Sequence, residues 1–201
     1  MFESVFAFAA ALVNPDLVQV DQYSGDYSYL WLDENRQPHS QGDHPSKVDY
    51  DCDGNVTGMY WDNHGVAHRD NGPAMVVCNR WDTMVSWYNN GELSREGGPA
   101  RISYFGKDNR CTQMEWLRDG EMYRRGDLPT VVTTAANGVI VREEWLCEYG
   151  IKGTRKNGQP NVITYHSDGS LKSVEWRGPS RDEEYYETLG VDIDSLPAEE
   201  W

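Results

Sequence analysis

Arginine recurs through the middle of the chain, at Arg69, Arg95, Arg124 and, in a weaker copy, Arg155. A guanidinium group presents five donors in a planar fork. A row of such groups, with His68 beside the first, could therefore bind a carboxylate or phosphate ligand. The same planar cation could instead lie across an aromatic ring, for about 0.5–2 kcal/mol. Each arginine follows a tryptophan within the same predicted hairpin, so we expect stacking and keep ligand binding as the alternative.

One acidic string has the composition of a calcium site. Residues 49–56 match the first eight positions of an EF-hand loop, but position twelve is Tyr60, where calcium requires a bidentate glutamate. The same string aligns with the turn around Asp168-Gly169 in a later repeat. The alignment favours a hairpin turn over a calcium loop.

Two histidines invite comparison with a transition-metal site. His64 and His68, with Asp62, stand close together in the sequence, but the spacing of a helical metal site has no meaning on a hairpin, and we find no third histidine in register from another repeat. His39, His44 and His166 are expected at the surface or in turns. The sequence therefore predicts no bound metal ion and no cofactor.

The sequence contains no recognisable catalytic pattern. We find no nucleophile with a base and an orienting group, no paired carboxylates in apolar surroundings, and no glycine loop of the kind that binds phosphate. The glycines stand in turn dipeptides and the acids in turns and near the termini. We therefore expect a protein that is not an enzyme.

Acidic residues dominate both ends of the chain. The formal net charge is -15; residues 1–61 carry ten acids and two bases, residues 62–176 carry fifteen and fourteen, and residues 177–201 carry eight and two. Such a charge repels nucleic acid, because phosphate binding depends on Lys and Arg. It favours a partner protein with a basic surface. In the last segment, the candidate binding residues are Asp182, Glu183, Glu184 and Glu187.

Composition also bears on location. The mean hydropathy is -0.73 and no apolar run approaches 18 residues, so we expect no membrane-spanning helix. The four cysteines are widely separated and form no C-x-x-C pair, which is typical of reduced, cytosolic thiols. We expect a cytoplasmic protein.

Tryptophan and proline mark an internal repeat. Trp31, Trp61, Trp87, Trp116, Trp145 and Trp176 recur at spacings of 30, 26, 29, 29 and 31, with one registered proline between each pair: Pro45, Pro73, Pro99, Pro129 and Pro160. The residue three places after each proline is β-branched, as expected on a half-buried pleated surface. Apolar residues two places before most of the later tryptophans alternate with intervening, mostly polar ones, which indicates strands.

Turn dipeptides join the predicted strands. Asp53-Gly54, Asn137-Gly138 and Asp168-Gly169 stand in register and predict type I′ hairpins, and a second turn follows each tryptophan, as at Asn90-Gly91 and Asp119-Gly120. The fold class predicted is all-β: an elongated antiparallel β-meander of five hairpin repeats of about 29 residues, with 10–15 strands in all. A single sheet of that size would be roughly 50–70 Å long.

The repeats divide the chain into three parts. We expect an N-terminal cap with a short helix over residues 1–28, the repeat array over 29–176, and an acidic C-terminal cap with a short helix over 177–201. The helices would end near Asn14-Pro15 and at Gly190. Polar caps would keep the open edges of the sheet from stacking, although pairing of edges could still form homo-oligomers.

The string Trp61 to Ala74, which reads Trp-x-x-x-Gly-x-x-His-Arg-x-x-Gly-Pro-Ala and is echoed at 87–100, resembles hairpin repeats of phage and large-virus proteins and, more loosely, MORN repeats. The resemblance covers about residues 29–176, and the copies after Trp116 and Trp145 depart from the Gly-Pro-Ala corner. It implies a viral or mobile-element source and a binding role.

Two functions are consistent with these features. The first is a protein-binding module, such as a phage inhibitor of a host defence or nucleic-acid-binding protein, that acts through its acidic ends or a sheet face. The second is a protein that sequesters a small anionic ligand between its tryptophan and arginine rows, or serves as an assembly spacer. The sequence favours the first through its charge alone.

Overall fold

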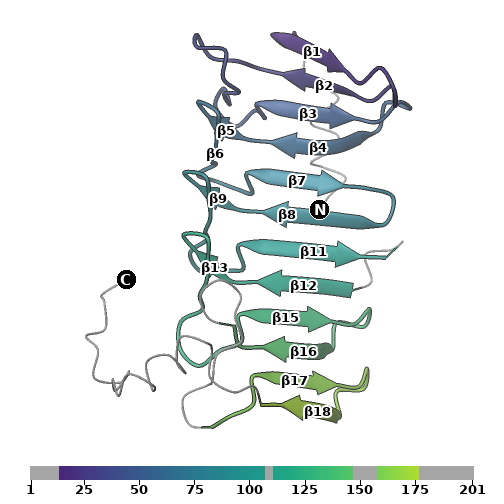
Figure 1. Ribbon diagram of the computed structural model, residues 1–201, viewed down its shortest axis with the longest axis vertical. Helices are drawn as coiled ribbons and strands as arrows, with labels where there is room; N and C mark the ends of the chain where they lie inside the picture. The colour runs from purple at the N-terminus through teal and green to yellow at the C-terminus, as the bar shows by residue number, and fades with distance from the viewer. Residues whose placement is uncertain (1–13, 107–110, 147–157, 177–201) are drawn as a thin grey trace, which may run out of the picture.

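The computed structural model describes residues 14–106, 111–146 and 158–176. Twelve strands form one sheet in which every strand pairs with its neighbours in chain order, and all pairs are antiparallel (Figure 1). They are β1 (Leu17–Val20), β2 (Tyr27–Leu30), β3 (Lys47–Tyr50), β4 (Val56–Tyr60), β7 (Met75–Cys78), β8 (Asp82–Ser86), β11 (Arg101–Phe105), β12 (Cys111–Glu115), β15 (Val131–Thr134), β16 (Ile140–Glu144), β17 (Val162–Tyr165) and β18 (Leu171–Glu175). The predicted all-β meander is confirmed.

Short hairpins follow three of the tryptophans. They are β5 (Asp62–Asn63) with β6 (Val66–Ala67), β9 (Tyr88–Asn89) with β10 (Glu92–Leu93), and β13 (Leu117–Arg118) with β14 (Glu121–Met122). They line up along one side of the sheet, on the left in Figure 1, where Gly91 N donates to Ala67 O and Gly120 N donates to Leu93 O. Each of these repeats therefore adds a short hairpin to its two long strands.

The apolar positions of the repeat form one continuous row of paired residues across the sheet. Each residue three places after a registered proline pairs with a residue two places before a tryptophan, on both sides. The row runs Val48, Met59, Val76, Val85, Ile102, Met114, Val132, Glu143, Ile163, Val174. Val48 and Met59 are fully buried and Val76 is nearly so. Because side chains alternate along a strand, keeping the register keeps this row on one face.

The opposite face is polar but not simply exposed. Arg101 pairs with Glu115 at 3.2 Å, and Arg142 Nε donates to Glu144 Oε1 at 2.6 Å. Glu115 and Ser86 are nevertheless buried. Both faces of the sheet therefore contain buried side chains.

The turns divide into two types, and one prediction about them is wrong. At Asp53-Gly54, Asn137-Gly138 and Asp168-Gly169, only the glycine has positive φ, so these loops are not type I′ turns. In the first of them, Gly54 N donates to Asp51 O and Asp51 N donates to Asn55 O, which makes a three-residue loop with a glycine bulge. The short hairpins differ, because both Asn90 and Gly91 have positive φ, as a type I′ turn requires.

The sheet extends beyond the predicted array at its N-terminal end. β1 and the first half of β2 fall within the segment 1–28 that was expected to form a helical cap. The two predicted helices fall mainly on residues 1–13 and 177–201, outside the described residues, and the described residues contain no helix. Among these residues, no helix is long and apolar enough to cross a membrane. Cys52, Cys78 and Cys111 are free thiols.

Candidate functional site

The recurring arginines lie on the tryptophans of their own repeats. The guanidinium carbon stands 3.9 Å from the ring centre for Arg69 on Trp61, 3.8 Å for Arg95 on Trp87, and 3.7 Å for Arg124 on Trp116. The predicted stacking is confirmed for these three. Arg155 lies outside the described residues.

Each stacked arginine also donates a hydrogen bond to the proline corner that follows it in the sequence. Nη1 donates to the carbonyl oxygen of the registered proline: Pro73 and Pro99 at 3.2 Å, and Pro129 at 2.8 Å. In the first two copies the guanidinium group also lies against the glycine before the proline, Gly72 for Arg69 and Gly98 for Arg95. A methyl group added to Gly98 would lie 3.1 Å from the guanidinium carbon of Arg95. In these two copies the glycine of the Gly-Pro corner is therefore part of the stack, whereas the Arg124 stack has Leu128 before its proline.

Each of the three guanidinium nitrogens of Arg69 already contacts an oxygen atom of the chain. Its Nε and Nη2 both contact Asp43 Oδ1 at 2.8 Å, and Trp61 Nε1 donates to the backbone oxygen of Asp43 at 2.9 Å. A cavity of about 520 Å³ opens here and is lined by Trp61, Arg69, His68 and Asp43 among others. With a carboxylate of the chain already on the guanidinium group, the cavity offers little to an anionic ligand.

Arg95 and Arg124 lack this internal anion. Two places before the registered proline, where the first repeat has Asp43, the next two repeats have Asn71 and Gly97. In the part of the chain that the structure describes, neither arginine forms an ion pair, and burial lowers the pKa of both. Their arrangement is that of packed scaffold groups, which weakens the case for a ligand-binding row.

Histidines join neighbouring repeats along the short hairpins. His68 Nδ1 accepts from the backbone N–H of Asn90 at 3.2 Å, and its Nε2 contacts Asp70 Oδ1 at 3.1 Å. His39 does the same one repeat earlier, because its Nδ1 accepts from the backbone N–H of His64 at 3.3 Å. His68, a candidate residue of the alternative ligand-binding row, makes a contact between repeats.

One histidine pair was missed by the sequence analysis. The rings of His39 and His64 stack with their centres 4.2 Å apart, and His64 Nδ1 donates to Asp33 Oδ2 at 2.5 Å. That hydrogen bond, with backbone donors at Gln37 and Asn35, lowers the pKa of Asp33. His39 N donates to Trp31 O just as His68 N donates to Trp61 O, so the two histidines are equivalent. One extra residue after Trp31 hid the equivalence.

These histidines do not assemble a metal or catalytic centre in the described residues. No group of three or more His, Cys, Asp or Glu side chains is placed to hold a metal ion there. His64 hydrogen-bonds to Asp33, but among the same residues no hydroxyl or thiol lies within hydrogen-bond reach of its ring. The stacked pair and its hydrogen bonds join the loop after Trp31 to the turn between β5 and β6.

The calcium-like string forms the predicted hairpin turn between β3 and β4. Asp51 Oδ1 accepts from the backbone N–H groups of Asp53 and Asn55 at 3.0 and 2.7 Å, and the side-chain amide of Asn55 donates to Oδ2 at 2.9 Å. The carboxylate that would lead a calcium loop thus holds its own turn. These bonds lower the pKa of Asp51, the side-chain bond from Asn55 most of all.

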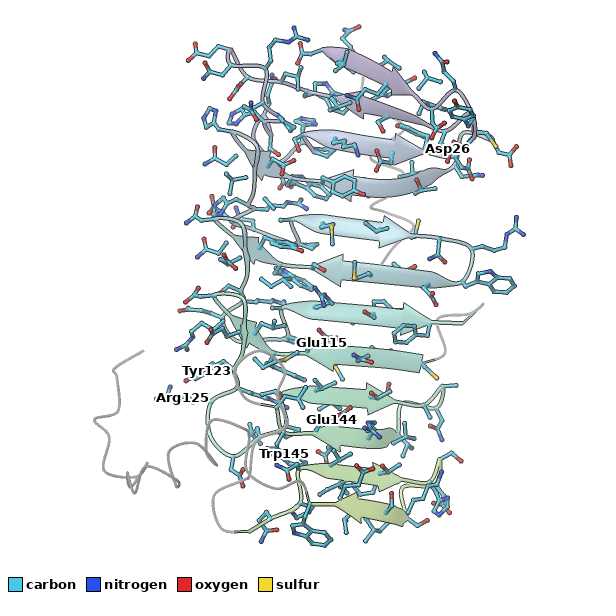
Figure 2. The ribbon with its side chains drawn as sticks, in the orientation of Figure 1. Asp26, Glu115, Tyr123, Arg125, Glu144 and Trp145 are labelled. Carbon is cyan, nitrogen blue, oxygen red and sulfur yellow. The ribbon has the colours of Figure 1, made fainter. Side chains whose placement is uncertain are left out.

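Four aspartates gather where this turn meets the β1–β2 loop; we call Asp21, Asp26, Asp51 and Asp53 the acidic corner. Asp26 Oδ1 accepts from the backbone N–H of Cys52 at 3.0 Å and so ties the two loops together. Asp26 lies at the right-hand ends of the N-terminal strands, across the sheet from the short hairpins (Figure 2). Loop residues 21–26 and 51–55 include no lysine or arginine, so no cation within these loops neutralises the corner.

A cleft of about 430 Å³ adjoins the acidic corner. Asp21, Asp26 and Asp49 line it together with Lys47, which pairs with Asp49, and with Tyr27 and Tyr50, whose rings stack with centres 4.9 Å apart. Hydrogen bonds from the backbone N–H groups of the loop lower the pKa of Asp21, which keeps it ionised. Carboxylates beside aromatic faces are the surroundings that suit a lysine or arginine side chain.

Comparison with known protein families finds none that matches this chain, and no curated protein matches it either. The resemblance to viral hairpin repeats therefore remains a prediction. The candidate residues Asp182, Glu183, Glu184 and Glu187 lie outside the described residues. The acidic corner is the candidate site that the described residues present.

Proposed function

We propose that this protein is a protein-binding module that does no chemistry itself and engages a basic surface of another protein through the acidic corner. The observation that carries the proposal is the joining of two loops that hold four aspartates and no cation. Residues 14–61 as a whole carry nine acidic and two basic side chains, and one of those bases, Lys47, already pairs with Asp49 at 2.9 Å. The surplus negative charge is available to a partner.

An acidic corner of this kind would speed the encounter with a basic partner protein and favour such partners over acidic ones. An acidic field steers a basic partner toward this end of the sheet, and the attraction weakens as salt screens it, over about 8 Å at physiological ionic strength. The competing function, sequestration of an anion by the arginine row, is disfavoured by the occupied guanidinium group of Arg69. The viral resemblance makes a bacterial or other host protein the first candidate partner, and inhibition of that protein the expected consequence.

Capture from a bacterial lysate over a salt series tests the proposal. The corner variant combines Asp21→Asn, Asp26→Asn, Asp51→Asn and Asp53→Ser. Asparagine keeps the oxygen that accepts the loop N–H groups, and the Asp53 carboxylate accepts no hydrogen bond within the described residues. The matched control removes four charges elsewhere, by Glu92→Gln, Glu96→Gln, Asp119→Asn and Asp168→Asn, so that both variants move the net charge from -15 by the same amount.

We expect the wild-type chain and the control to retain the same basic proteins at low salt, and the corner variant to lose them. Retention should fall as salt rises through the physiological range. If the corner variant retains these proteins as well as the control does, the acidic corner is not the binding surface. If the wild-type chain retains no basic protein at any salt concentration, the proposed function is wrong.

A further inference from the structure

β1 forms one edge of the sheet that the structure describes. Among the described residues it pairs with β2 alone. Asp21 N donates to Asp26 O, and in an antiparallel ladder this fixes which residues point inward: Gln19 toward β2, Val18 and Val20 away from it. The backbone N–H and C=O groups of Val18 and Val20 are therefore directed outward, where another strand could pair with them.

The side chains of this strand also favour an added neighbour. Val18 and Val20 are 50% and 61% exposed, and they stand beside Tyr29 and Tyr27 on one face of the sheet. An additional strand with apolar residues at alternate positions would cover the valines and continue the face. The cleft of the acidic corner is lined by Gln19 and Val20 as well as by its aspartates, so the pairing edge and the acidic corner form one continuous surface.

The other edge of the sheet is protected in the way natural edge strands usually are. β18 carries two charged side chains, Lys172 and Glu175. Charged side chains at an edge discourage pairing with another strand. β1 has the sequence Leu-Val-Gln-Val, with no charge and no proline within the strand. The difference points to β1 as the edge that is used.

We propose that β1 binds an extended segment of a partner protein as an additional antiparallel strand, with basic residues at the start of that segment. An antiparallel strand would begin beside Val20, so its first side chains would lie over the cleft lined by Asp21 and Asp26. A second copy of this chain is a poor occupant, because two acidic ends would be brought together. This inference rests on the proposed function and names the segment that the acidic corner selects.

The probe is a synthetic peptide of about eight residues, a common strand length, in which two lysines precede alternating valine and threonine. One control peptide carries glutamates in place of the lysines, and another carries the lysines at its other end. Fluorescence anisotropy at low salt should show the first peptide binding at least about tenfold more tightly than either control. This ratio corresponds to about 1.4 kcal/mol, within reach of a few charge contacts.

Substitution at Val18 tests the edge itself. Because the N–H of Val18 points away from β2, Val18→Pro removes no bond of the native sheet, and proline is tolerated on such an edge. It removes a donor that the added strand needs, so affinity should fall about tenfold or more. Val18→Thr keeps the donor and should bind like wild type. Equal melting temperatures of the two variants would show that the loss is not unfolding.

Hydrogen exchange identifies the occupant. In the free protein, the amides of Val18 and Val20 should exchange rapidly while that of Gln19 is protected, and the peptide should protect all three. Protection of Val18 before peptide is added would assign the edge to residues 1–13 or to a second copy, and would overturn the inference. So would equal peptide binding by the Val18→Pro variant. Basic proteins captured equally by wild type and Val18→Pro would leave the proposed function standing while rejecting this edge.

Discussion

Arg95→Ala removes the guanidinium group that stacks on Trp87. No ion pair is broken, since Arg95 has no carboxylate partner in the described part of the chain. Two contacts are lost. The stack on Trp87 contributes about 0.5–2 kcal/mol, and the hydrogen bond to the Pro99 oxygen contributes about 0.5–1.5 kcal/mol. We expect the free energy of unfolding to fall by about 1–3 kcal/mol, a large share of the stability of an ordinary domain.

Urea unfolding followed by tryptophan fluorescence measures this loss. The midpoint should shift to lower urea with little change in slope, which indicates a change in stability and not in the surface exposed. Arg80→Ala is the matched control, because Arg80 is an exposed arginine of the β7–β8 loop and its removal changes the net charge equally. It should change stability by less than about 0.5 kcal/mol.

A double-mutant cycle with Trp87→Leu separates the stack from the hydrogen bond. If the guanidinium group and the indole ring attract each other, the double variant should lose about 0.5–2 kcal/mol less than the sum of the two single losses. Strictly additive losses, or an Arg95→Ala variant as stable as Arg80→Ala, would refute the conclusion that the arginine is a scaffold group. Loss of partner binding with unchanged stability would assign it to recognition instead.

Three further outcomes are expected. Gly98→Ala should destabilise the fold by about 1 kcal/mol because the added methyl group would lie 3.1 Å from the Arg95 guanidinium carbon, and the cost should shrink in an Arg95→Ala background. Because the pKa of Asp33 is lowered in the folded protein, its contribution to the free energy of unfolding is complete above the ordinary aspartate pKa and is lost as pH falls through the lowered pKa. The free energy of unfolding of Asp33→Asn should therefore fall less steeply than that of wild type over this pH range. Burial and the bond to Glu143 raise the pKa of Tyr165 to about 12, so its ultraviolet titration should move toward lower pH in Glu143→Gln.

The long strands could be predicted because two signals in the sequence agree. A proline marks the corner of every repeat, and the β-branched residue three places later, as at Val76, fixes the side-chain face. The residue two places before tryptophan, as at Val85, then falls opposite it, and the pairing of Val76 with Val85 follows that rule. Where local pattern and pairing coincide in this way, register is readable from sequence.

The turn types could not be read with the same certainty. A dipeptide such as Asp53-Gly54 is compatible with a two-residue type I′ loop and with a three-residue loop in which only the glycine has positive φ. The choice depends on how many residues the flanking strands leave unpaired. Here Asp51 N donates to Asn55 O, which leaves three residues, 52–54, in the loop. The dipeptide alone does not contain that count.

The stacked histidines were missed for a similar reason. His39 follows Trp31 by eight residues, whereas His68 follows Trp61 by seven, so a strict alignment places them at different positions. The extra residue lies in the loop where Arg36 has positive φ. His39 therefore occupies the position equivalent to His68. A loop can accommodate such an insertion at little cost, but it hides the equivalence from a fixed spacing.

The regularly spaced tryptophans and prolines build one stack of paired hairpins. Backbone nuclear Overhauser contacts across the repeat boundaries test this arrangement most directly, between Met59 and Val76 and between Val85 and Ile102. Both sets of contacts are predicted, since these residues are register partners on β4 and β7 and on β8 and β11. Absence of both, with contacts instead among the indole rings of different repeats, would contradict the account.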